Sequence, residues 1–187
     1  AVNTPVGIAV DSNGLLYVSD INRHVICTVD PDTGQVTDIA GSSGQTGSSD
    51  GTGTGARFYH PSRLDVGPDG CVYVCDRWNN TVRRVTPAGV VTTVAGFAEA
   101  QGSNDGTGSS ARFYSANSVC ADASGVFYIA DTHNHTIRRA VDARTVGFWQ
   151  FNEGTGTVAG DASGRGNDGA LANEPTWVDG INEGAVS

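Results

Sequence analysis

The stretch DTHNHTIRR, Asp131–Arg139, combines an aspartate with two histidines that are two residues apart. On a strand, residues i and i+2 point to the same side, so His133 and His135 would share a face. Imidazole and carboxylate groups in this arrangement are typical of a zinc site or of a general base. The stretch therefore raises the question of whether the chain performs chemistry here.

The chain is largely built from a repeated unit, and this governs how each local motif is interpreted. Three repeats begin 56 and 55 residues apart, at Pro5, Pro61 and Ala116. In each repeat a glycine ends a polar turn, a tyrosine lies within the next apolar run, and an aspartate ends that run. These equivalent residues are Gly14, Gly70 and Gly125; Tyr17, Tyr73 and Tyr128; and Asp20, Asp76 and Asp131.

Neither of the other two repeats retains both histidines. Tryptophan stands at one of these positions and cannot ligate zinc, so the repeats do not share a metal site. What they share is the aspartate and an Asn or His at a turn, where such side chains bond the local backbone and tolerate tight geometry. We therefore interpret the motif as architectural. The aligned residues are His133 with Asn22 and Trp78, and His135 with His24 and Asn80.

Each repeat is predicted to form four short strands separated by turns, because its apolar segments are rich in Val, Ile and Tyr. A unit of four strands is the pattern of a propeller blade, which buries both faces only by stacking on neighbours. Leu16 and Val18 are expected to face one neighbour, and Tyr17 the other. In the first repeat the strands are expected at about residues 7–11, 15–19, 24–29 and 36–40.

These repeats resemble the NHL repeat, whose family folds as a β-propeller, commonly with six blades. The third repeat carries the family pattern as GVFYIADTHNHTIRR, and the inserts DGTGTGARF and DGTGSSARF resemble linkers of bacterial NHL proteins. The resemblance covers residues 1–142 and implies blades over 1–57, 58–112 and 113–142. One enzyme of the family is an amidating lyase that uses zinc, and no residue of this sequence matches its ligands.

Residues 146–187 resemble the beginning of a laminin-G-like, concanavalin-type jelly roll, through GFWQFNEG, DASGRGNDG and PTWVDGINEGAVS. The predicted fold class is thus all-β: about three four-stranded NHL-type blades in an incomplete ring, followed by an incomplete β-sandwich segment. We expect the sequence to be an excerpt of a longer protein, the alternative being completion by partner chains. Two chains would supply six blades.

A calcium site is one candidate in the second region. Asp161, Asn167 and Asp168 offer oxygen ligands on a flexible loop, which suits Ca²⁺, and the lectin-like jelly rolls that the segment resembles often bind calcium. The alternative is a turn that is rich in Asp, Asn and Gly for backbone reasons. No other cofactor is indicated.

The glycine-rich motif DGTGTGA at residues 50–56 has a spacing reminiscent of phosphate-binding loops. It lacks their lysine and is duplicated at residues 105–111, so we interpret it as a linker. Phe58 and Phe113 are expected to anchor this linker between blades.

The four cysteines, Cys27, Cys71, Cys75 and Cys120, have no C-x-x-C spacing. Cys71 and Cys75 would lie roughly 13 Å apart along one strand, too far for a disulfide. We predict small buried thiols, with a bridge between other strands left open.

Two further motifs lie on the repeat itself. Asn79 and Asn134 begin glycosylation sequons, a match that we regard as incidental. The arginine pairs are predicted to bind acidic neighbours, with one member of each pair on either face of its strand. They are Arg83 with Arg84 and Arg138 with Arg139.

Composition and charge exclude several classes of function. A net charge of −9 and a pI of about 4.6 disfavour binding to nucleic acid. The sequence contains no apolar run of about 18 residues, the length that a membrane-spanning helix needs. No catalytic triad or carboxylate pair can be assembled. We expect a non-catalytic, extracellular recognition or scaffold module that binds protein or carbohydrate. The alternatives are a self-assembling structural protein, completed by neighbouring chains, and the scaffold part of a propeller metalloenzyme.

Overall fold

The computed structural model describes residues 1–98 and 100–141, together with four two-residue strands nearer the C-terminus. Antiparallel strands and short 3-10 turns form the described part, which contains no α-helix. None of its helical turns has the length and apolar character needed to cross a membrane. The predicted all-β class is confirmed.

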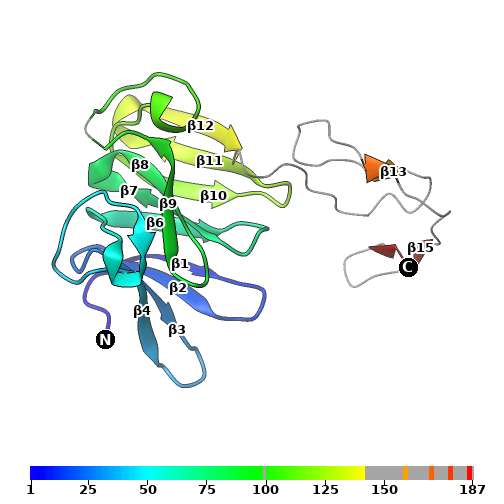
Figure 1. Cartoon of the computed structure of the whole chain (residues 1–187), viewed down its shortest axis with the longest axis horizontal. Helices are drawn as coiled ribbons and strands as arrows, with labels where there is room; N and C mark the ends of the chain where they lie inside the picture. Colours follow the sequence, from blue (N-terminus) through cyan, green and yellow to red (C-terminus); the bar gives the residue numbers. More distant parts are fainter. Residues whose placement is uncertain (99, 142–157, 160–168, 171–176, 179–184, 187) are drawn as a thin grey trace.

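The three repeats form three antiparallel sheets in chain order, which Figure 1 shows one after another. The first blade contains β1 (Pro5–Val10), β2 (Leu16–Asp20), β3 (Val25–Val29) and β4 (Val36–Gly41). The second contains β6 (Pro61–Val66), β7 (Val72–Asp76), β8 (Thr81–Val85) and β9 (Val90–Gly96). The third contains β10 (Ala116–Ala121), β11 (Val126–Asp131) and β12 (Thr136–Val141).

Linkers join the blades and add small elements to them. β5 (Gly51–Thr52) pairs with the outer edge of β9, so the second sheet has five strands. The 3-10 turns are η1 (Gly53–Gly55), η2 (Arg77–Asn79), η3 (Gly108–Ser110) and η4 (Thr132–Asn134). η2 and η4 occupy equivalent positions, between the second and third strands of their blades.

The blades stack face to face, and two equivalent apolar cores lie between them. β6 contacts β1 and β2, and β10 contacts β6 and β7. In the first core Tyr17 packs with Val72 and Val74, and in the second Tyr73 packs with Phe127, their ring centroids 4.0 Å apart. Tyr17 therefore faces the following blade.

The linker phenylalanines close these cores, as predicted. Phe58 and Phe113 are both buried, one in each core. Each linker between two blades is thus anchored by a phenylalanine in the apolar core between those blades.

Two sequence-based expectations were wrong in detail. The third strand was expected to include His24, but it begins at Val25, because His24 adopts a left-handed backbone with φ of 58° that ends the preceding turn. Cys120 was expected to be buried and is exposed, whereas Cys27, Cys71 and Cys75 are buried. All four cysteines are free thiols.

Towards the C-terminus, β13 (Val158–Ala159) pairs with β14 (Gly169–Ala170), and β15 (Trp177–Val178) pairs with β16 (Ala185–Val186). The predicted calcium ligands Asp161, Asn167 and Asp168 lie outside the described residues. The jelly-roll interpretation of residues 146–187 stays a prediction.

Candidate functional site

The aspartate that ends the second strand of each blade holds the incoming chain against that blade. Asp76 and Asp131 are fully buried. Asp76 Oδ1 accepts the Tyr59 amide at 2.7 Å, and Asp131 Oδ1 accepts the Tyr114 amide at 2.8 Å. Asp20 likewise accepts amides from the segment that precedes β1. Each blade thereby fixes the segment that leads into its own first strand.

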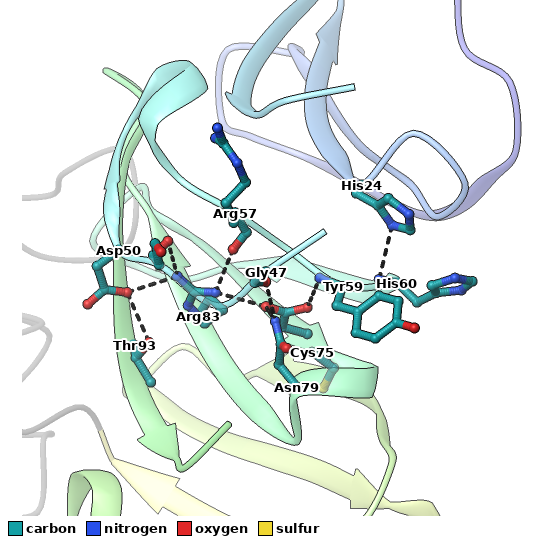
Figure 2. A network of polar contacts seen from close by, with 12 residues as sticks. His24, Gly47, Asp50, Arg57, Tyr59, His60, Cys75, Asn79, Arg83 and Thr93 are labelled. Carbon is teal, nitrogen blue, oxygen red and sulfur yellow. Dashed lines mark hydrogen bonds and ion pairs between the residues drawn. The ribbon is translucent and has the colours of Figure 1, made fainter. Parts of the chain in front are cut away.

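An arginine completes this network in the second and third blades, and it is buried in the second and partly buried in the third. Figure 2 shows the Arg83 guanidinium between Asp50 and the carbonyl of Arg57. Its Nη1 lies 2.8 Å from Asp76 Oδ2, and its Nη2 lies 2.8 Å from Asp50 Oδ1. The guanidinium also covers the Phe58 ring, 5.2 Å from its centroid. One side chain therefore joins β8, the linker and the strand-end aspartate.

Arg138 repeats this arrangement in the third blade. It pairs with Asp131 at 3.1 Å and with Asp105, and it covers the Phe113 ring. The first blade has Cys27 at the equivalent position. The predicted pairing of these arginines with acidic neighbours is confirmed for Arg83 and Arg138, and Arg84 pairs with Asp69 at 2.8 Å.

Both sequon asparagines belong to the same network. Asn79 Nδ2 donates to the Gly47 carbonyl at 2.6 Å and to Asp76 at 2.7 Å. Asn134 Nδ2 makes the equivalent bonds to Gly102 and Asp131. The nitrogen to which a glycan would be attached is therefore engaged in the folded chain, which fits the interpretation of these sequons as incidental.

The residue after each turn has a left-handed backbone, and in the first two blades its side chain contacts the next blade. The φ angles of His24, Asn80 and His135 are 58°, 55° and 55°. His24 Nδ1 accepts the His60 amide at 3.3 Å, and Asn80 Oδ1 accepts the Ser115 amide at 2.8 Å. The two blade interfaces thus use the same contact, once with a His–His pair and once with an Asn–Ser pair.

Aromatic side chains gather where these turns meet the linkers. Trp78 stacks on His60 with ring centroids 3.9 Å apart and an angle of 10°, while Tyr59 meets Trp78 edge to face at 4.8 Å. Tyr114 and His133 form the equivalent edge-to-face pair, also at 4.8 Å. We call these five residues the turn face.

The turn face is held rigidly yet remains accessible. The Trp78 amide donates to the Tyr59 carbonyl at 3.1 Å, and the His133 amide donates to the Tyr114 carbonyl at 3.1 Å. Trp78 is nevertheless 50% exposed and Tyr114 is 38% exposed. Large aromatic surface on a fixed backbone is suited to binding a ligand without a large loss of conformational entropy.

Burial and charge set the protonation of this region. Burial lowers the pKa of His24, an effect opposed by Asp20. Burial also lowers the pKa of His60, and the nearby His24 and Arg77 lower it further. Both imidazoles are therefore neutral at pH 7, which agrees with the acceptor role of His24 Nδ1. Burial raises the pKa of Asp76 to about 6 despite Arg83 and Asn79, so its carboxylate is largely ionised at pH 7.

The structure gives the two histidines of the DTHNHTIRR stretch different structural roles. His133 packs on Tyr114, whereas His135 provides the left-handed turn position. Among the residues that the structure describes, no group of three His, Cys, Asp or Glu side chains is placed to hold a metal ion.

A hollow of about 420 Å³ lies among the turns that join the first and second strands of all three blades. Two of its lining carboxylates are already used within their own turns. Asp11 Oδ1 accepts the amides of Asn13 and Leu15, and Asp122 Oδ1 accepts those of Ser124 and Val126. The turn face therefore offers the stronger candidate site.

All three repeats fall within segments that match models of known protein families. Residues 23–142 match the model described as the teneurin NHL domain, and residues 2–27 match the NHL repeat. The Arabidopsis thaliana protein SUPPRESSOR OF QUENCHING 1, chloroplastic, is 32% identical over 81 residues, which are 43% of this chain and 8% of that protein.

Solved structures share the blade arrangement. An auxiliary nutrient binding protein from Bacteroides ovatus is 31% identical with a TM-score of 0.62, covering 71% of this chain and 36% of that one. A Bacteroides thetaiotaomicron protein provisionally named a phosphatase is 30% identical with a TM-score of 0.62, covering 72% and 34%. This chain therefore spans about a third of the length of these structures.

Replacing Arg83 with Met tests the buried network. The substitution leaves Asp76 buried without its cationic partner, so we expect the free energy of unfolding to fall by about 3–5 kcal/mol. Arg84→Met, in the neighbouring partly exposed pair, is expected to cost under about 1 kcal/mol. Urea denaturation of both variants measures the difference. Equal losses would show that Arg83 is an ordinary surface arginine in energetic terms.

Exchanging the His–His contact for the Asn–Ser contact tests the protonation of the turn face. Because folding lowers the pKa of both histidines, the unfolded chain binds more protons, and their contribution to stability is lost as pH falls below 6.5. The double variant His24→Asn/His60→Ser is expected to fold and to lose less stability between pH 7 and pH 5 than the parent. Denaturant midpoints across this range provide the measurement, and parallel curves would contradict the assignment.

Proposed function

This chain belongs to the teneurin NHL domain family, and from that premise we propose that it acts as a recognition module whose ligand-binding surface is the turn face. The ligand is a protein or a carbohydrate, bound without chemical conversion. The module acts outside the cell or at its surface. The observation that carries the proposal is the exposed Trp78 ring on a backbone fixed by buried polar contacts.

The chemistry of the turn face supports binding rather than catalysis. Trp and Tyr are the residue types that contribute most energy to recognition surfaces, because they bury much area with few rotatable bonds. Here His60 covers one face of the Trp78 ring and Tyr59 meets it edge on, which leaves half of the residue for a partner. The flat apolar face of a sugar ring fits such a surface, as does an apolar or aromatic side chain of a protein.

The solved relatives add support at the level of binding. The Bacteroides ovatus protein is named for nutrient binding, and its identity of 31% extends over 71% of this chain. A carbohydrate ligand is consistent with that name. The lectin-like resemblance of residues 146–187 favours the same ligand class, and the calcium proposed at Asp161, Asn167 and Asp168 would belong to that segment.

Truncating Trp78 tests this function. Binding is first measured by a glycan array and by capture of cell-surface proteins, and the affinity of any ligand found is then titrated. Trp78→Ala is expected to weaken the affinity at least about 10-fold, as removal of a central aromatic contact does. Val90→Ala, an exposed position on β9 away from the turn face, is expected to leave it unchanged. A ligand that binds both variants equally would place the site elsewhere.

A further inference from the structure

Arg77, in the turn between β7 and β8, differs from Arg83 and Arg84 of the same blade in having no carboxylate partner among the described residues. It follows Asp76 directly in the chain, but that carboxylate is buried and turned into the interior network. The Arg77 side chain is half-buried, so its cationic end is available to a ligand. The arginines that do pair are Arg23 with Asp38, Arg83 with Asp50 and Asp76, Arg84 with Asp69, and Arg138 with Asp105 and Asp131.

A buried serine in the segment that enters the third blade holds Arg77 in place. Arg77 Nε donates to Ser115 Oγ at 2.8 Å. Ser115 is 7% exposed, and its own amide donates to Asn80 Oδ1 at 2.8 Å. The contact through Nε does not use the two Nη groups of the guanidinium, which together form a planar edge that can pair with a carboxylate through two hydrogen bonds. The cation is therefore positioned before any ligand arrives.

Arg77 also lies beside the aromatic part of the turn face. Arg77 and Trp78 are consecutive residues of η2, and the Arg77 amide donates to the His60 carbonyl at 3.3 Å. The charge of Arg77 is close enough to contribute to the lowered pKa of His60. A fixed cation and a half-exposed indole that is stacked on an imidazole therefore share one surface.

The combination of a guanidinium with an indole occurs in the second of the three repeats and in neither of the others. The aligned pairs are Ile21 with Asn22 in the first repeat and Thr132 with His133 in the third. The site thus belongs to the blade that packs against a described blade on each side. None of the five residues of the turn face is acidic, although the chain carries a net charge of −9. This surface is therefore a local exception on a chain that otherwise repels anions.

We propose that the turn face of the second blade binds a carbohydrate that carries a carboxylate, with the sugar ring on Trp78 and the carboxylate paired with Arg77. The inference rests on the proposed function of the turn face as a recognition surface, and it names the ligand class. In a sugar acid the carboxylate projects from the edge of the ring, whereas the ring face presents apolar C–H groups. One sugar unit can therefore contact both an aromatic ring and the adjacent guanidinium.

An acidic protein segment fits this arrangement less well. The side chain of Asp or Glu pairs with a guanidinium but has no apolar face that would cover the indole of Trp78. A peptide would need an acidic and an apolar residue held in one geometry, and ordering both of them costs conformational entropy. A sugar acid has the two features in one rigid ring.

Calorimetric titration of the full chain with an oligogalacturonate and with its methyl ester tests the pairing. The two probes have the same sugar rings and differ in charge. The parent chain is expected to bind the acid at least about 10-fold more tightly than the ester. Arg77→Met is expected to abolish this difference by weakening binding of the acid while leaving binding of the ester unchanged. Equal affinity of the parent for both probes would overturn the proposal, unless sialyllactose binds at least about 10-fold more tightly than lactose, which would identify a sialic acid as the sugar acid.

Two further variants separate charge from geometry. Arg84→Met makes the same change in net charge at a partly exposed ion pair with Asp69, in the turn between β6 and β7, and it is expected to bind the acid like the parent. Arg77→Lys keeps the charge but loses the planar pair of donors, so an intermediate affinity is expected. Circular dichroism checks that each variant folds. Equal weakening by Arg84→Met and Arg77→Met would reduce the effect to net charge and contradict a site at Arg77.

The outcomes distinguish this inference from the proposed function. If acid and ester bind equally and Trp78→Ala weakens both, the turn face recognises sugars without reading their charge, so the inference alone is wrong. If a hexaglutamate peptide binds through Arg77 while no sugar acid does, the ligand is an acidic protein and the carbohydrate assignment is wrong. If a bound sugar acid is unaffected by Trp78→Ala, the turn face is not the binding surface, and both proposals are wrong.

Discussion

The buried pairing of a strand-end aspartate with an arginine is the interaction on which the rest of this structure depends. Asp76 and Arg83 are removed from water, and both also bind the linker: Asp76 accepts the Tyr59 amide, and Arg83 donates to the carbonyls of Ser49 and Arg57. A long glycine-rich linker has little apolar surface to bury and a large conformational entropy to lose. The ion pair therefore fixes the linker in place, and Phe58 anchors it in the apolar core.

Because the linker is fixed, the residues at its end acquire a defined position. Tyr59 and His60 follow Phe58 directly. Tyr59 contacts Trp78 of the same blade, and both Tyr59 and His60 contact His24 of the preceding blade. The surface that we propose for ligand binding is therefore positioned by these polar contacts, and the third blade repeats the arrangement with Tyr114 and His133. The first blade has Cys27 in place of the arginine, and its Asp20 still accepts the amides of Asn3 and Thr4, so the aspartate contact forms there without this ion pair.

Sequence reasoning recovered the repeated elements well, because a strand period, a turn glycine and an aligned aspartate are local signals that three repeats reinforce. It anticipated the linker anchors at Phe58 and Phe113 for the same reason. It missed the turn face, since the Tyr59–Trp78 contact joins residues 19 positions apart that only the folded linker brings together. It also misjudged Cys120, because hydropathy alone does not reveal that this position of the third blade's first strand is exposed.

The most direct test of the central claim is amide hydrogen exchange at Tyr59 and Tyr114, measured residue by residue by NMR. Both amides lie in linkers outside any strand, yet each donates to a buried aspartate. If these carboxylates hold the linkers, both amides exchange as slowly as the central amides of β7 and β11. If they exchange as rapidly as the exposed amides of the same linkers, the aspartate–arginine network does not position the turn face.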